Sequence, residues 1–244
     1  MGYELGPCMI LVYNLHTATA SVNSATGISE SDTTIPYDGA SGTFPDRGVI
    51  KIDDELILYM ARTDTEFKNC VRGFKGTTAA SHADDASITL EYSDLGKTQG
   101  GVTLTVSETS VQLRTDQDGE VPVDEIITGT PVTVTLNLAD ITLDNFAFVH
   151  KSTKQTSGDK AKVEVYPNVG KSLLNDASYK VLIVPYAGAA PSNDVNRMIV
   201  IPKAGVRSAE ELVFNISDQR VIRCELTGYP DDAGRVLIFG DEDI

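Results

Sequence analysis

The fold is decided by residues 94–151, which read DLGKTQGGVTLTVSETSVQLRTDQDGEVPVDEIITGTPVTVTLNLADITLDNFAFVHK. Apolar and polar residues alternate over residues 102–106 and again over residues 132–138. A period of two predicts β-strands that bury one face and leave the other face polar. An acidic loop, residues 116–125, lies between the two strands. We therefore expect this stretch to form one folding unit with a half-buried sheet.

A short helix is predicted directly after the second strand. Asp140 or Thr142 can accept hydrogen bonds from the exposed N–H groups of a first helical turn. The apolar residues that follow recur at helical spacing and predict the buried stripe: Leu143, Phe146 and Ala147, broadened by Ile141 and Val149. His150 and Lys151 would end the helix, because donors or positive charge are favourable at its negative end.

Composition limits the classes of protein that the chain can belong to. Its 244 residues allow one or two domains, and 35 acidic against 20 basic residues give a net charge of −15. Such a charge excludes nucleic-acid binding by phosphate neutralisation. The general interpretation of this charge is solubility. The more specific interpretation is a surface that repels DNA. No apolar run approaches 18 residues, so no membrane insertion is expected.

Short strands at near-regular spacing are predicted for the rest of the chain. Residues 8–13 would form a first strand, and residues 152–159 and 203–211 would be polar connections. The other predicted strands lie at residues 49–52, 56–59, 87–90, 161–166, 179–185, 198–202, 212–216, 221–227 and 235–239. The three cysteines are odd in number and far apart, so we expect reduced thiols: Cys8, Cys70 and Cys224.

The sequence carries no recognisable catalytic or cofactor-binding motif, and we expect neither an enzyme nor a cofactor. The three histidines have no metal-ligand partner at helical spacing or in a paired cysteine motif, and we expect satisfied surface or core residues: His16, His82 and His150. Residues 116–120 open like a calcium loop. The sixth position, however, is Val121 instead of Gly and the twelfth is Ile127 instead of Glu, which excludes an EF-hand.

Two short acidic runs leave a looser Ca²⁺ or Mg²⁺ site open. They are Asp53, Asp54 and Glu55, and Asp241, Glu242 and Asp243. A solvated acidic turn is the simpler interpretation of both runs, because carboxylates in turns usually face water. We therefore predict no metal site.

Several runs resemble the tail tube, or major tail, protein of long-tailed bacteriophages. They are GKTQGGVTLTVS, DQDGEVPVDEIITGT, TLNLADITLDNFA and the C-terminal VFNISDQRVIRCELTGYPDDAGRVLIFGDED. The resemblance covers residues 1–14 and 92–244. It implies an all-β fold with one flanking helix, an antiparallel β-sandwich or barrel-type tail tube fold. It also implies a structural virion protein, assembled in the host cytoplasm, whose hexameric rings stack into the tail tube.

The same resemblance implies a set of partners. Copies of the chain would form the rings, and tape measure, terminator and baseplate or tip proteins would contact the tube. DNA would pass through the tube into the host without specific binding. The polar faces of the threonine-rich strands would line the lumen.

Residues 15–91 interrupt the pattern of the family, in which a turn follows the first strand quickly. We therefore predict a small inserted β module here, because long insertions at surface turns cost little loop-closure entropy. The run GVIKIDDELILYMARTDTEFKNCVRGFKGTTAASHADDASI is similar to a module in phage tail-tip and fibre proteins. We expect the module on the outside of the tube, because six copies in the lumen would obstruct DNA.

The acidic loop supplies the candidate site residues. Its five carboxylates cannot be buried unpaired, so they are exposed or paired with Lys or Arg of a neighbouring subunit: Asp116, Asp118, Glu120, Asp124 and Glu125. In tail tubes the corresponding region belongs to a long hairpin and loop that pack rings together. The resemblance therefore implies a role in assembly, ring stacking or the lumen.

Two other functions stay open at this point. One is a tail-end ring, such as a terminator or distal tail protein, which forms one hexamer and no polymer. The other is a receptor- or glycan-binding tail appendage whose active part is the inserted module. Trp is absent, and the aromatic residues that the module offers to a glycan are Tyr37, Phe44, Tyr59, Phe67 and Phe74. Self-polymerisation separates the tail tube from both.

Overall fold

The computed structural model describes residues 6–167, 169–175, 178–208 and 219–242. Strands account for 50% and helical residues for 6% of the chain, with one α-helix among the described residues. This confirms the predicted all-β class with one helix. No helix in the described ranges is long and apolar enough to cross a membrane.

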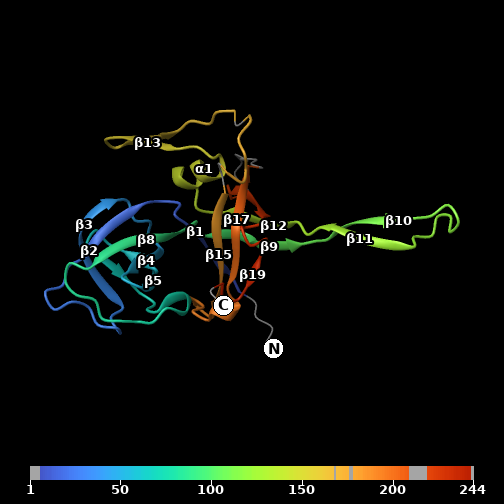
Figure 1. The fold of residues 1–244 in the computed structure, drawn as a ribbon. Helices are drawn as coiled ribbons and strands as arrows, with labels where there is room; N and C mark the ends of the chain where they lie inside the picture. Colours follow the sequence, from blue (N-terminus) through green and yellow to red (C-terminus); the bar gives the residue numbers. More distant parts are fainter. Residues whose placement is uncertain (1–5, 168, 176–177, 209–218, 243–244) are drawn as a thin grey trace.

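One large antiparallel sheet forms most of the molecule (Figure 1). Its strands follow the order β6-β7-β3-β2-β8-β1-β15-β17-β18-β12-β9. The strands of the part we call the body are β1 (Cys8–Tyr13), β9 (Thr98–Val106), β12 (Val132–Leu138), β15 (Ser178–Ala187), β17 (Ile199–Ser208) and β18 (Ile222–Tyr229), with short β16 (Ala190–Pro191) and β19 (Ile238–Phe239). The strands that lead into and form the predicted module are β2 (Ala18–Val22), β3 (Thr34–Gly42), β4 (Gly48–Ile52), β5 (Glu55–Tyr59), β6 (Ala61–Arg62), β7 (Glu66–Lys68) and β8 (Ser87–Asp94).

Two further hairpins stand apart from this sheet (Figure 1). The first pairs β10 (Thr109–Leu113) with β11 (Asp124–Gly129), and the second pairs β13 (Lys154–Ser157) with β14 (Lys160–Val163). The helix α1 (Leu143–Val149) follows β12, and two 3₁₀ turns, η1 (Phe74–Gly76) and η2 (Val195–Arg197), lie in connections.

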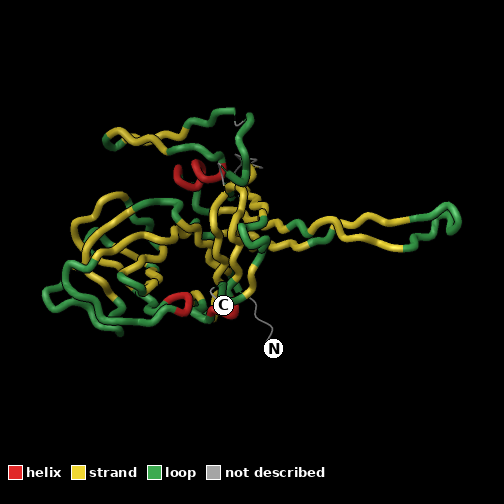
Figure 2. Tube along the Cα trace, in the orientation of Figure 1, coloured by secondary structure: helices red, strands yellow, loops and turns green. Residues whose placement is uncertain are grey.

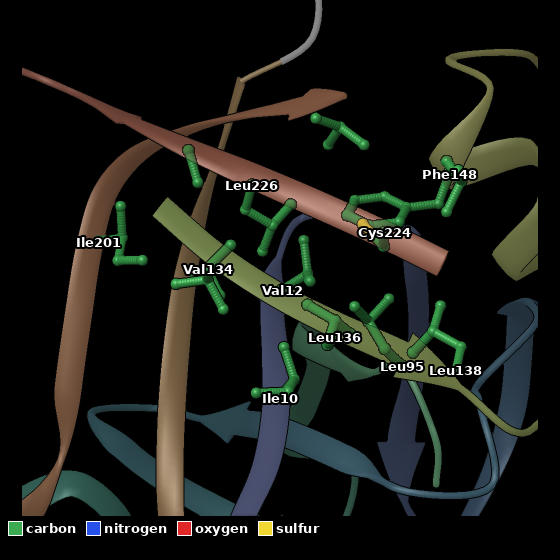
Figure 3. Packing of buried hydrophobic residues seen from close by; sticks show 14 of the residues in the cluster. Ile10, Val12, Leu95, Val134, Leu136, Leu138, Phe148, Ile201, Cys224 and Leu226 are labelled. Atoms are coloured by element: carbon green, nitrogen blue, oxygen red, sulfur yellow. The ribbon is translucent and has the colours of Figure 1, made fainter. Parts of the chain in front are cut away.

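Strand β12 lies where the alternating pattern predicted it. Val132, Val134, Leu136 and Leu138 are buried, and the residues between them are half-buried. The strand pairs with β9 on one side and with β18 on the other. Figure 3 shows its apolar side chains meeting those of β1 and β18 in one core. Since β1 and β12 are distant in the sheet order yet share a core, the sheet closes over itself as a sandwich.

Helix α1 begins and ends as predicted, but its buried face differs. Thr142 caps the first turn, with its Oγ1 accepting a hydrogen bond from the N–H of Asn145 at 3.1 Å. The prediction that Leu143 and Ile141 are buried is wrong, because their side chains are 40% and 48% exposed. Asn145 is buried instead, and its side-chain amide donates to the carbonyls of Leu95 and Asp140. These two bonds rotate the helix away from the predicted stripe.

Several strands lie where none was predicted. Strands β2 and β3 occupy a Ser-, Thr- and Gly-rich region, and β13 occupies the predicted polar loop. Residues 203–208 extend β17 instead of forming a polar connection, because each pairs with a residue of β18. In each case a neighbouring strand satisfies the backbone, which overrides weak local propensity. The predicted strand at residues 212–216 lies outside the described residues.

The module is joined to the body by shared strands and a shared core. Strand β8 pairs with β2 and β4 and also with β1 of the body. One buried cluster contains Leu58 and Phe74 from residues 15–91 together with Leu182 and Val200 from the body. A junction of this kind holds the module in a fixed orientation.

Leu136→Ala tests the core assignment. We expect the free energy of unfolding to fall by about 2–5 kcal/mol, because a fully buried leucine leaves a cavity in a close-packed core. Urea denaturation at a concentration where the chain is monomeric measures this change. The matched control is Leu113→Ala on the exposed hairpin, which we expect to alter stability by less than about 0.5 kcal/mol. Equal losses for both variants would contradict the assignment.

Candidate assembly surface

The five predicted site carboxylates lie on a hairpin that projects from the body. We call residues 109–129 the acidic arm; they comprise β10, β11 and the connection between them. Figure 2 shows two extended strands that end in a loop far from the sheet. The arm therefore brings together the residues that the sequence predicted, with Asp124 and Glu125 on β11 instead of in a loop.

The acidic arm has the composition of a surface that is covered in an assembly. Both its strands and its loop expose large apolar side chains, which are 41–67% accessible: Val111, Leu113, Val121, Val123, Ile126 and Ile127. Val111 lies opposite Ile126 on one face, whereas Ile127 lies on the other face opposite Ser110. A two-stranded ribbon with apolar residues on both faces is marginally stable alone in water. A partner that covers it would stabilise it.

The carboxylates of the arm form only local hydrogen bonds. Asp118 accepts from Thr115 and Glu125 accepts from Ser110. Among the described residues, none of the five is in an ion pair, and Arg114 donates to Gln112 instead. The arm thus carries five carboxylates against one arginine, a net charge of −4 that is not compensated within the chain.

The polar face of the sheet next to the arm is the other predicted functional surface. Thr103 of β9 lies beside Thr135 of β12, which lies beside Glu225 of β18. The next row of β12 and β18 places Asn137 beside Arg223. This face is rich in hydroxyl groups and mixed in charge. It is therefore neutral in character, and the net charge of −15 resides elsewhere on the molecule.

Strand β9 also exposes hydrogen-bonding backbone. It ends the sheet order, with β12 on one side and no described strand on the other. Its nine residues present unpaired N–H and C=O groups to any chain that approaches this edge. The acidic arm and the free edge adjoin, because β9 leads into β10.

The acidic run at residues 53–55 is a structural cluster that the sequence only partly predicted. Glu55 is buried and accepts a bidentate ion pair from Arg72, with contacts of 2.9 and 2.7 Å, and hydrogen bonds from the N–H groups of Gly73 and Ala80. Burial alone would raise the pKa of Glu55, but these bonds and one from His82 hold it far below its usual range, at about 2. The interpretation of a solvated turn is wrong for this residue.

His82 is the satisfied core histidine that was expected. Its Nδ1 lies 2.8 Å from Asp53 and its Nε2 lies 2.8 Å from Glu55. Both ring nitrogens therefore have a carboxylate partner. No group of His, Cys, Asp or Glu arranged to hold a metal ion occurs in the described ranges. The sequence did not predict this cluster, because Glu55, Arg72 and His82 lie far apart in the chain and form no motif.

A cleft lies between the module and helix α1. Its volume is about 1530 Å³, and Arg47 and Asp94 line it near the junction. Arg47 lies 2.9 Å from a carboxylate oxygen of the buried Asp94. Burial raises the pKa of Asp94 to about 6, and Arg47 opposes this rise. The pair anchors the module side of the cleft to the end of β8.

The C-terminal segment also ties the module to the body. The carboxylate of Glu242 lies 2.5 Å from the ammonium of Lys75 in the module and 2.6 Å from that of Lys180 in β15. Glu242 belongs to the second predicted acidic run, so at least this member of the run is ion-paired and not solvated. The ion pairs of Glu242 give no support to a Ca²⁺ or Mg²⁺ site at this run.

Comparison with known proteins adds no identification. No protein-family model matches the chain, and no characterised protein matches it in sequence. The assignment of function therefore rests on the residues and geometry described above.

Glu55→Gln tests the buried cluster. Above pH 4.5 we expect a loss of about 3–5 kcal/mol in the free energy of unfolding, because the variant leaves Arg72 buried without its counter-charge. The pKa of Glu55 is lower in the folded chain than its usual 4.5, so its contribution is present above pH 4.5 and is lost as the pH falls toward 2. The difference between wild type and variant should shrink over that range.

Denaturation at a series of pH values measures this difference. Asp54→Asn, at an exposed position in the same turn, is the control and should follow the wild-type pH profile. A Glu55→Gln profile that stays parallel to wild type down to pH 2 would contradict the role of the cluster.

Proposed function

We propose that the chain is the tail tube subunit of a long-tailed bacteriophage, with an inserted β module on the outer surface. Copies form hexameric rings that stack into a tube for DNA delivery, in the virion tail. The observation that carries the proposal is the acidic arm, an isolated ribbon that exposes apolar residues and uncompensated carboxylates. A surface of this kind needs another subunit to cover it. The resemblance of residues 1–14 and 92–244 to the tail tube family implies that this other subunit is a second copy of the chain.

The free edge of β9 supports lateral association. An exposed strand edge of nine residues is an aggregation hazard unless another strand pairs with it. Closure of six copies into a ring removes the edge, as closure does in a barrel. The polar face of β9, β12 and β18 would then line the channel. Its hydroxyl groups and mixed charges offer phosphates no continuous basic surface, so DNA passes without specific binding.

The position of the module supports its placement outside the tube. Figure 1 shows the module and the acidic arm on opposite sides of the body. The module therefore leaves free both the arm and the edge of β9, which are the surfaces that contact other copies in this proposal. Tape measure, terminator and baseplate or tip proteins are the partners expected at the ends of such a tube.

The glycan-binding alternative loses its structural basis in the module. The five aromatic residues on which it depended are 0–3% exposed: Tyr37, Phe44, Tyr59, Phe67 and Phe74. Four of them pack together, with Tyr37 and Phe67 stacked at 4.3 Å between ring centroids. They form the core of the module and present no platform on which a sugar ring stacks.

Electron microscopy of the purified chain over a concentration series tests the proposal. We expect rings and tubes with a central hole, and knobs on the outer wall where the module lies. Single hexamers that never stack would indicate the tail-end ring. Density for residues 15–91 inside the channel would refute the outer placement of the module.

Removal of the arm tests its role in stacking. The variant replaces residues 112–125 by Asn-Gly, a two-residue hairpin turn between the paired Val111 and Ile126. We expect a folded chain with stability within about 1 kcal/mol of wild type, because the deleted residues are exposed. Tubes should be absent at every concentration. Tubes of normal length without the arm would contradict a stacking role.

A further inference from the structure

We infer that the acidic arm of one copy docks on a basic surface at the opposite end of the next copy. This basic surface consists of Lys151, Lys160, Lys162, Lys171 and Arg207, of which Lys162 is ion-paired with Glu164 at 2.6 Å. The inference rests on the proposed function, and it names the contact through which copies join.

Positive charge in this acidic chain is concentrated at one end. Residues 151–171 hold five of the 20 Lys and Arg residues against two carboxylates, a net charge of +3 in a chain of −15. The segment contains the hairpin β13–β14. Helix α1 contacts both β14 and β17, which brings Arg207 of β17 to the same end of the molecule.

Three of these cations, Lys151, Lys171 and Arg207, lie close together, and Arg207 lies across the sheet from Glu225 of β18. The side chain of Lys151 donates to the carbonyl of Val206 at 3.0 Å. Burial lowers the pKa of Lys151, and the charges of Lys171 and Arg207 lower it further. Within the described ranges, neither Lys171 nor Arg207 is in an ion pair, and the same holds for Lys160 on the hairpin. Like charges held together in this way favour an anionic partner.

Apolar residues accompany the basic surface, as they accompany the acidic arm. Val165 and Tyr166 follow β14 directly, and their side chains are 50% and 65% exposed. The arm can therefore bury its valines and isoleucines against apolar atoms while its carboxylates meet ammonium and guanidinium groups. An interface with an apolar centre and a charged rim is typical of specific protein contacts.

The two surfaces cannot meet within one chain. Figure 1 shows the acidic arm leaving one side of the body and the β13–β14 hairpin extending on the other side. The contact is therefore between copies, and it joins different surfaces of each copy. Head-to-tail contacts propagate from copy to copy, as the stacking of rings requires.

Charge reversal in two complementary variants tests the contact. The first variant is Asp116→Lys with Glu120→Lys, and the second is Lys160→Glu with Lys162→Glu. All four side chains are exposed, so both variants should fold, as circular dichroism checks. The first variant changes the net charge of the arm from −4 to zero, and the second changes that of residues 151–171 from +3 to −1. Each variant alone should need at least about a tenfold higher concentration than wild type to assemble, because the attraction between its arm and its basic surface is lost.

An equimolar mixture of the two variants should assemble again. The two introduced lysines of the first variant face the two introduced glutamates of the second, and the unchanged arm of the second faces the unchanged surface of the first. A mixture of Asp54→Lys and Lys51→Glu chains is the control; each should assemble alone as wild type does, because both residues lie in the module.

Carbodiimide cross-linking of wild type locates the contact directly. The reagent joins a carboxylate to a lysine that it touches, and a mixture of ¹⁴N- and ¹⁵N-labelled chains distinguishes links between copies. We expect links from the acidic arm to Lys160, Lys162 or Lys171. Tubes whose links lie elsewhere, or variants that assemble as wild type does, would overturn the inference and leave the tail tube proposal standing. A wild-type chain that neither assembles nor cross-links would overturn both.

Discussion

The strict alternation of residues 132–138 is the constraint on which the body depends. Side chains of a strand change face at every residue, so a slip of one residue would move Val134 and Leu136 from the core into solvent. The alternation therefore sets the pairing of β12 with both β9 and β18. Through β9 it also sets the direction in which the acidic arm leaves the sheet. A buried core strand thus determines the direction of the arm, although almost none of the residues of the arm are buried.

Much of the body was predictable because local pattern and tertiary environment agree there. Strands β1 and β12 lie at the predicted residues, and Thr142 caps the predicted helix. The predicted secondary structure differed from the observed one where pairing with a neighbouring strand overrides the local pattern. Strand β3 contains two glycines and a proline, and it is extended because β2 and β7 supply its hydrogen bonds. No local pattern in the sequence of β3 predicts that these strands pair with it.

The candidate site was predictable in its residues but only partly in its shape. Five carboxylates close together must face water or a cation, and this argument needs no structure. Their place at the end of an isolated ribbon depends on how β9 and β12 are paired, which composition does not reveal. The cluster of Glu55, Arg72 and His82 shows the opposite case. Its members are far apart in sequence, so their common burial became visible only with the fold.

The continuity of β8 has a mechanical consequence. This strand pairs with β2 and β4 at the module and with β1 at the body, so no flexible linker separates the two parts. Antiparallel hydrogen bonds run perpendicular to the strands. A force that pulls the module along β8 therefore loads many of these bonds in shear at once, and they must rupture together before the module detaches. Tension applied to the module is thus transmitted directly to the body.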